Sequence, residues 1–129
     1  MGIKQVEAIN AAISEVFSEE NEGALCCTIE TVNGDGQDVS VQVMQDSINI
    51  SPYPYEDDPL TRFELTGLLQ DLDEPELETV DWDANVFATV GTGELEAEEV
   101  AELVDLVFVK ILACEDKTYE IKATTEDLG

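Results

Sequence analysis

Apolar residues recur at intervals of three and four positions near the start of the chain, a spacing that predicts an amphipathic helix over residues 3–17. Charged and polar residues fill the positions between them. The apolar stripe of this helix consists of Ile3, Val6, Ile9, Ile13, Val16 and Phe17.

Three short runs after this helix alternate apolar and polar residues, which is the period of a β-strand. They span residues 24–32, 38–44 and 47–51, with the turn-forming sequence NGDG at 33–36 and a shorter turn at 45–47 between them. Pro52 and Pro54 end the third run. We therefore expect a three-stranded antiparallel meander.

The pattern in the second half of the chain is less regular. Residues 60–72 are compatible with a short helix or with a strand, and residues 71–83, with seven acids and no base, indicate an exposed loop or edge. Residues 85–90 predict a further strand, and residues 118–124 alternate in the manner of an edge strand.

Residues 94–114 predict a long helix, with glutamates in its first turns where the helix dipole favours acids. Beyond Val100 it is apolar on almost every side, whereas a surface helix needs one apolar stripe. We expect it to be sandwiched within the chain or shared with a second subunit, and a homodimer through residues 94–114 is predicted as a possibility.

Together these elements predict one α+β domain over residues 1–129. Its antiparallel sheet contains the three-stranded meander plus one or two further strands. The sheet packs against the N-terminal helix and the long C-terminal helix.

Charge changes the picture of what such a domain can bind. The chain has 31 Asp and Glu against 5 Lys and Arg, a formal net charge of −26. Direct binding to nucleic acid or to an anionic membrane is disfavoured, since few cations are present to neutralise phosphates. Another protein with a basic surface is the predicted partner.

The location of the protein is predicted from what the sequence lacks. It has no recognisable signal peptide and no apolar run near the ~20 residues of a membrane span. Three cysteines at Cys26, Cys27 and Cys114 do not form a disulfide framework, so we expect a cytoplasmic protein. The cysteines are interpreted as buried small hydrophobes or, alternatively, as a redox sensor.

The residue types needed for common catalytic chemistry are missing. The chain has no histidine, which excludes histidine-dependent nucleophilic catalysis and most zinc sites. No glycine loop has the spacing that cradles phosphate, and NGDGQDVSVQVM lacks the glycine and final glutamate of a calcium-binding EF-hand loop. We therefore predict no enzyme activity, no catalytic residue, no metal site and no cofactor.

Aromatic residues beside carboxylates are the candidates for contact with a basic partner. Trp82 is interpreted either as a core anchor or as an aromatic contact surrounded by acids, and the two tyrosines allow the same alternatives. Eleven acids lie between Glu56 and Asp83 against the single Arg62. The predicted partner-binding residues are Tyr53, Tyr55, Glu56, Asp57, Asp58, Asp71, Asp73, Glu74, Glu76, Glu78, Asp81, Trp82 and Asp83.

The element order and the apolar helix sequence LVDLVFVKIL resemble the type III secretion chaperone and YbjN-like group over residues 3–113. That resemblance implies a small dimerising protein that binds polypeptides. The acidity also resembles that of phage- or plasmid-encoded DNA mimics, including inhibitors of restriction and CRISPR enzymes.

Two main hypotheses follow for function. The first is a chaperone-like or adaptor-like module that binds a polypeptide, and the second is an inhibitor that occupies the basic groove of a nucleic-acid-binding protein. A third interpretation is an ordinary domain adapted to high salt, although lysine outnumbers arginine four to one.

Overall fold

The computed structural model describes residues 3–17, 25–32, 36–51, 53, 55–72, 76–93, 95–112, 114 and 120–127. The sheet is built from strands β1 (Leu25–Val32), β2 (Asp38–Val43), β3 (Ser47–Ser51), β4 (Glu78–Asp83), β5 (Phe87–Gly91) and β6 (Lys122–Asp127). The helices are α1 (Ile3–Ile13), α2 (Pro59–Leu65), α3 (Leu68–Asp71), α4 (Ala97–Leu106) and the π-helix η1 (Val107–Ile111).

All six strands form one antiparallel sheet in the order β4-β5-β3-β2-β1-β6. The predicted meander is confirmed, with Cys27 opposite Val43 and Val43 opposite Ile48. Three strands join it instead of one or two. The acidic stretch before residue 83 supplies edge strand β4, and the last strand begins at Lys122, later than the expected residue 118, and extends into the acidic tail.

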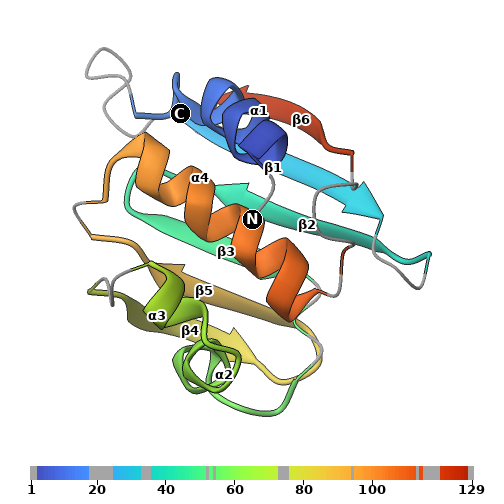
Figure 1. Cartoon of the computed structure of the whole chain (residues 1–129), viewed down its shortest axis with the longest axis vertical. Helices are drawn as coiled ribbons and strands as arrows, with labels where there is room; N and C mark the ends of the chain where they lie inside the picture. Colours follow the sequence, from blue (N-terminus) through green and yellow to red (C-terminus); the bar gives the residue numbers. More distant parts are fainter. Residues whose placement is uncertain are drawn as a thin grey trace.

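The helices cover one face of this sheet, so the fold is a two-layer α+β arrangement, as the sequence predicts (Figure 1). Helix α4 lies across the middle of the sheet, with α1 on its β6 side and α2 and α3 on its β4 side. Side chains from α1, α4, η1 and the inner face of the strands form the core, which includes Ile9, Ile13, Val41, Val104 and Phe108.

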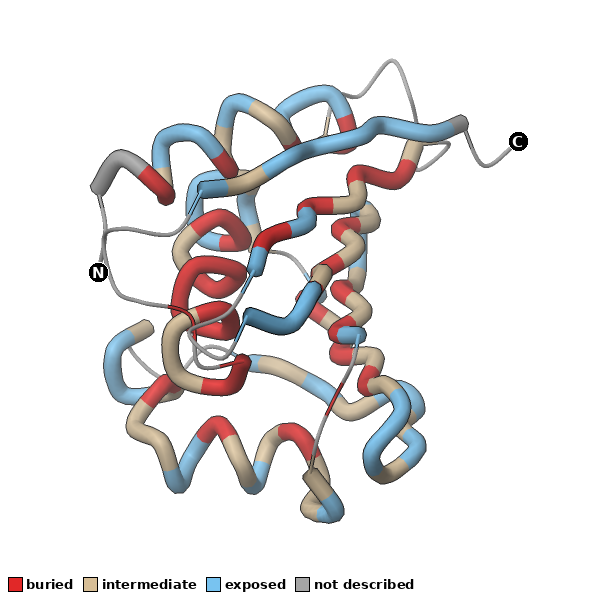
Figure 2. Tube along the Cα trace, turned by 90° about the vertical axis from the view of Figure 1, so that its right-hand side faces the viewer, coloured by how far each residue is buried: buried red, intermediate tan, exposed pale blue. Residues whose placement is uncertain are grey.

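The C-terminal helix is buried within a single chain. Residues 100–108 are buried except for Glu102, and Figure 2 shows the buried coils of α4 beside the strands, with other helices above and below them. The apolar circumference is therefore explained by burial within the chain, the first of the two alternatives, and a homodimer through residues 94–114 stays a prediction. The α-helix spans only Ala97–Leu106, and the chain continues as η1.

The ambiguous stretch at 60–72 forms two short helices because local capping favours helix. The carboxylate of Asp58 accepts the N–H of Leu60 at 2.9 Å, and Pro59 occupies the first turn, where its missing N–H costs nothing. Gly67 separates α2 from α3 with a φ of 78°, a left-handed conformation that glycine adopts without strain.

The other face of the sheet is open and polar. Thr28, Gln42, Asn49 and Thr89 lie opposite one another on four neighbouring strands. The Asn49 amide donates to Gln42 Oε1 at 3.4 Å, and the Thr89 hydroxyl donates to Asn49 Oδ1 at 2.9 Å. These bonds link three of the four side chains to one another across the open face. None of the described helices combines the length and apolar character that crossing a bilayer requires.

Candidate functional site

The three aromatic residues singled out in the sequence lie together on the helix side of β4 and β5. Tyr53 packs edge-to-face against Tyr55, with ring centroids 5.5 Å apart, and against Trp82 at 6.3 Å. Tyr53 is 0% exposed, whereas Tyr55 and Trp82 are partly buried and pack against the core. Contacts of this kind stabilise an aromatic cluster beyond the area they bury.

Backbone bonds explain why these tyrosines turn inward. The N–H of Tyr53 donates to Val86 O at 3.3 Å, and the N–H of Asn85 donates to Tyr55 O at 3.2 Å. These bonds hold the segment after β3 along the β4–β5 turn, so Tyr53 faces the core. The prediction that Tyr53 is a surface contact for a partner is therefore wrong.

The tyrosine hydroxyls have structural partners as well. The Tyr53 hydroxyl donates to Asp57 O at 2.6 Å, and the Tyr55 hydroxyl donates to Ile111 O at 2.7 Å in η1. Burial, with a smaller effect from nearby carboxylates, raises the pKa of Tyr53 to about 12. Both rings therefore anchor the segment between β3 and α2.

Two of the predicted acids stabilise the chain around α2. Asp57 pairs with Arg62, whose guanidinium lies 4.2 Å above the Tyr55 ring. Asp58 caps α2 and also accepts the hydroxyl of Thr79 at 2.9 Å, which ties α2 to β4. Both carboxylates therefore already bind groups of the protein itself.

Asp71 has an internal partner too. Its carboxylate lies 2.6 Å from the Lys110 ammonium, which also donates to Thr66 O at 3.2 Å. Lys110 belongs to η1, so this pair connects the π-helix to α3. Asp71 therefore takes part in a structural ion pair, although its side chain is partly exposed.

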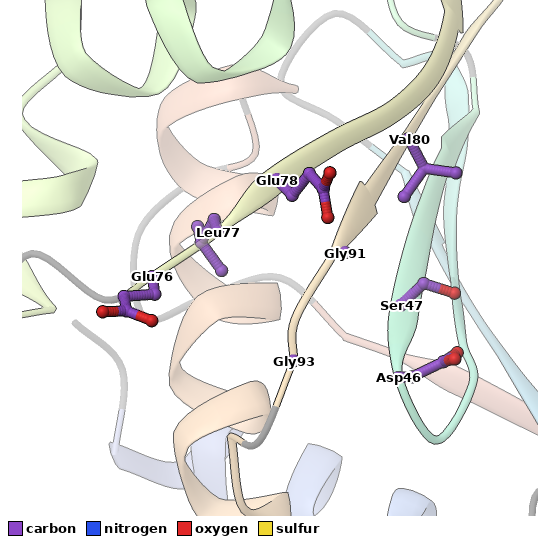
Figure 3. A pocket seen from close by; sticks show the side chains of 8 residues that line it. All are labelled: Asp46, Ser47, Glu76, Leu77, Glu78, Val80, Gly91 and Gly93. Carbon is purple, nitrogen blue, oxygen red and sulfur yellow. The ribbon is translucent and has the colours of Figure 1, made fainter.

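Other predicted acids border an open cleft of about 630 Å³ at one end of β4 (Figure 3). In this view Glu78 of β4 lies on one side of Gly91 and Gly93, and Val80 lies on the other side with Asp46 and Ser47 of the β2–β3 hairpin. The complete lining is Asp46, Ser47, Glu76, Leu77, Glu78, Val80, Gly91 and Gly93. We call these eight residues the acidic cleft.

The floor of the acidic cleft depends on a glycine. A Cβ atom built on Gly91 would lie 3.3 Å from Val80 Cγ2 and 3.5 Å from Glu78 O. The missing side chain thus keeps β4 and β5 close together and leaves the space above them open. Any larger residue at position 91 would occupy that space.

Negative charge continues from the cleft along β4. Asp46, Glu76 and Glu78 are exposed, and so are Asp81 and Asp83, with Asp81 opposite Thr89 of the open face. The nearby cations do not neutralise them, because Arg62 is bound to Asp57 and Lys110 to Asp71. Within the described part of the chain these acids form no ion pair, so the cleft and the rest of β4 present a surface of exposed carboxylates.

The structure brings together only part of the predicted set. Glu76 and Glu78 line the cleft, Asp81 and Asp83 follow on the same strand, and Glu56 is exposed outside the cleft lining. Asp73 and Glu74 lie outside the described residues.

Sequence reasoning missed the part of the cleft contributed by the β2–β3 hairpin. Asp46 and Ser47 lie in the predicted turn and at the start of the third predicted strand, and Gly91 and Gly93 follow the strand predicted at residues 85–90. Their proximity to Glu78 requires β5 to lie between β3 and β4. The glycines beside a strand were the available signal, since they often mark a close approach.

The cysteines are buried and free of disulfides. Burial raises the pKa of each thiol, to about 11 for Cys114, where Asp105 adds a smaller effect in the same direction. Such thiols are weak nucleophiles, which favours the interpretation as small buried hydrophobes. Within the described residues, no group of three or more Cys, Asp or Glu is arranged to hold a metal ion.

Comparisons with protein-family models, curated proteins and solved structures found no match for this chain. The resemblance to the type III secretion chaperone and YbjN-like group stays a prediction based on element order and acidity.

Proposed function

We propose that this protein is a non-enzymatic protein-binding module, adaptor-like or chaperone-like, that holds a basic segment of another polypeptide in the acidic cleft. The observation that carries the proposal is the position of three exposed carboxylates, those of Asp46, Glu76 and Glu78, around one open hollow. A lysine or arginine side chain has the charge and the apolar stem to fit between these acids and the side chains of Leu77 and Val80.

The exposed surface favours charge over apolar contact as the source of binding. Among the described residues, the exposed large hydrophobic side chains are Val32, Leu65, Val80 and Val86. They come from different elements, and single exposed hydrophobic residues are normal on a protein surface. A client held mainly by an apolar groove is therefore less well supported than a basic one.

A second candidate is an acidic inhibitor that occupies the basic groove of a nucleic-acid-binding protein. The exposed acids Glu78, Asp81 and Asp83 along one edge strand, together with a net charge of −26, favour it. The two candidates differ in a measurable way. An inhibitor of this type displaces DNA from its target protein, whereas an adaptor binds a basic segment without competing for a DNA site.

The test uses a fluorescent peptide of alternating arginine and alanine, and fluorescence anisotropy as the readout. The cleft variant carries Asp46→Asn, Glu76→Gln and Glu78→Gln. Each exposed carboxylate contributes roughly 0.2–1 kcal/mol, so removing all three should raise the peptide Kd between about threefold and about 100-fold at about 0.1 M NaCl. Raising the salt to about 0.5 M should weaken binding to the parent protein.

A matched variant controls for net charge. Glu7→Gln, Asp38→Asn and Glu64→Gln remove the same three charges from exposed positions on α1, β2 and α2, outside the cleft lining. Its Kd should stay near that of the parent. Equal losses in both triple variants would show general attraction to an acidic protein and would refute the cleft as the binding site.

A steric variant tests the hollow without changing charge. Gly91→Leu places a side chain above the floor of the cleft, where a Cβ already meets Val80 at 3.3 Å. We expect peptide binding to fall while circular dichroism keeps the parent signal. Retained binding in a folded Gly91→Leu protein would contradict insertion of a basic side chain.

A further inference from the structure

The two edges of the sheet differ in how they are protected against pairing with another strand. Edge strand β4 has a register irregularity between Thr79 and Asp81, and Asp81 Oδ1 accepts the N–H of Trp82 at 2.9 Å. Irregular pairing and exposed like charges are devices that keep an edge from recruiting strands. β4 has both.

Edge strand β6 lacks the register irregularity, and its charges are of both signs. Its six residues KATTED pair with β1 in an unbroken register, from Leu25 opposite Asp127 to Glu30 opposite Lys122. The strand contains no proline or glycine, and its side chains from Lys122 to Glu126 are exposed. Among the strands that the structure describes, none pairs with its outer side. It is a regular template for one more strand.

The sequence of β6 is complementary to itself. If two copies run antiparallel about Thr124, Lys122 of one copy lies opposite Glu126 of the other, twice by symmetry, and the two Thr124 residues face each other. The side chains of Lys122, Thr124 and Glu126 lie on the open face of the sheet. Each stands opposite a β1 residue of that face, in order Glu30, Thr28 and Cys26. Opposite charges and paired threonines both stabilise an antiparallel strand pair.

We infer that β6 pairs with β6 of a second copy, so that two chains form one continuous antiparallel sheet with a twofold axis at Thr124. The same arrangement at β4 would bring two rows of acids together. This dimer places the two acidic clefts at the far ends of the joined sheet, since β4 and β6 are opposite edges. The inference is independent of the proposed function.

Charge reversal tests the register. Lys122→Glu and Glu126→Lys each place two like-charged pairs across the interface, so each variant alone should dimerise at least tenfold more weakly than the parent. The Lys122→Glu variant has glutamate at both positions, and the Glu126→Lys variant has lysine at both. In a mixture every glutamate therefore lies opposite a lysine of the other variant, and the two should form a mixed dimer. Analytical ultracentrifugation at about 0.15 M NaCl, where the screening length of about 8 Å still exceeds the distance between opposed side chains, measures these Kd values.

The mixing experiment also controls for folding. Lys122→Glu places a second acid opposite Glu30 within its own chain, whereas Glu126→Lys faces the uncharged Cys26. Recovery of the dimer on mixing shows that both variants are folded and complementary. A monomeric parent at several hundred micromolar, or variants that fail to form the mixed dimer while circular dichroism shows both folded, overturns the inference.

A cysteine pair tests the geometry directly. Directly opposed residues of an antiparallel pair have Cα atoms about 4.5–5.5 Å apart, which lies within the Cα separation of about 4.4–6.8 Å found in disulfides. Thr124→Cys should therefore give a covalent dimer under mild oxidation. Lys122→Cys, displaced by several residues from its own symmetry mate, should not, and the native thiols are buried. Equal cross-linking of both variants, or none at position 124, refutes pairing about Thr124.

Failure of this dimer leaves the proposed function intact. The peptide assay reads the cleft on the opposite edge, and Thr124→Cys in its reduced form should bind the arginine peptide with the parent Kd. A cleft variant that loses peptide binding but keeps the parent Kd for dimerisation would show that the cleft acts independently of the β6 edge.

Discussion

Replacing Trp82 by alanine separates its two interpretations, as a core anchor and as an aromatic contact for a partner. Removing a fully buried aromatic ring costs about 3–5 kcal/mol. Trp82 is only partly buried, so its loss leaves an open depression instead of a closed cavity. The edge-to-face contact with Tyr53 adds about 0.5–1.5 kcal/mol to the loss. We expect Trp82→Ala to lower the free energy of unfolding by about 2–3 kcal/mol.

Urea unfolding followed by circular dichroism measures this change, because the variant has no tryptophan fluorescence. Trp82→Phe keeps a ring against Tyr53 and should recover all but about 1 kcal/mol. Val80→Ala, on the same strand but 60% exposed, should change stability by less than about 0.5 kcal/mol. A Trp82→Ala protein within about 0.5 kcal/mol of the parent that loses peptide binding would refute the anchor and favour the partner contact.

Three further predictions concern charge and titration. Arg62→Lys keeps the charge but loses the planar contact with Tyr55, so we expect urea unfolding to show a loss of about 1 kcal/mol; no loss would contradict that contact. Cys114 and Tyr53 have pKa values raised to about 11 and 12, so the unfolded chain ionises first and stability should fall as pH rises above 9; a flat profile in urea unfolding would refute their burial. Because the net charge is −26, adding NaCl up to about 0.5 M should raise Tm in calorimetry, and a fall in Tm would argue against self-repulsion.

Local pattern determined the elements whose partners lie next to them in sequence. Alternation and turn residues are enough to give β1, β2 and β3 as a meander, because a hairpin fixes both the neighbour and the register. The helical stripe gave α1, although the α-helix ends at Ile13 and a turn follows. The all-round apolar character of residues 100–108 correctly required a covered helix. The apolar pattern did not say which elements cover the helix.

Tertiary structure decided every relation between distant segments. The acidic cleft exists because β5 lies between β3 and β4, which brings Asp46 near Glu78 across 32 positions of sequence. Likewise, only the folded chain shows that Asp57 is occupied by Arg62 and that Tyr53 is buried. An acid's place in sequence gives its charge. Its availability depends on which cation the fold brings to it.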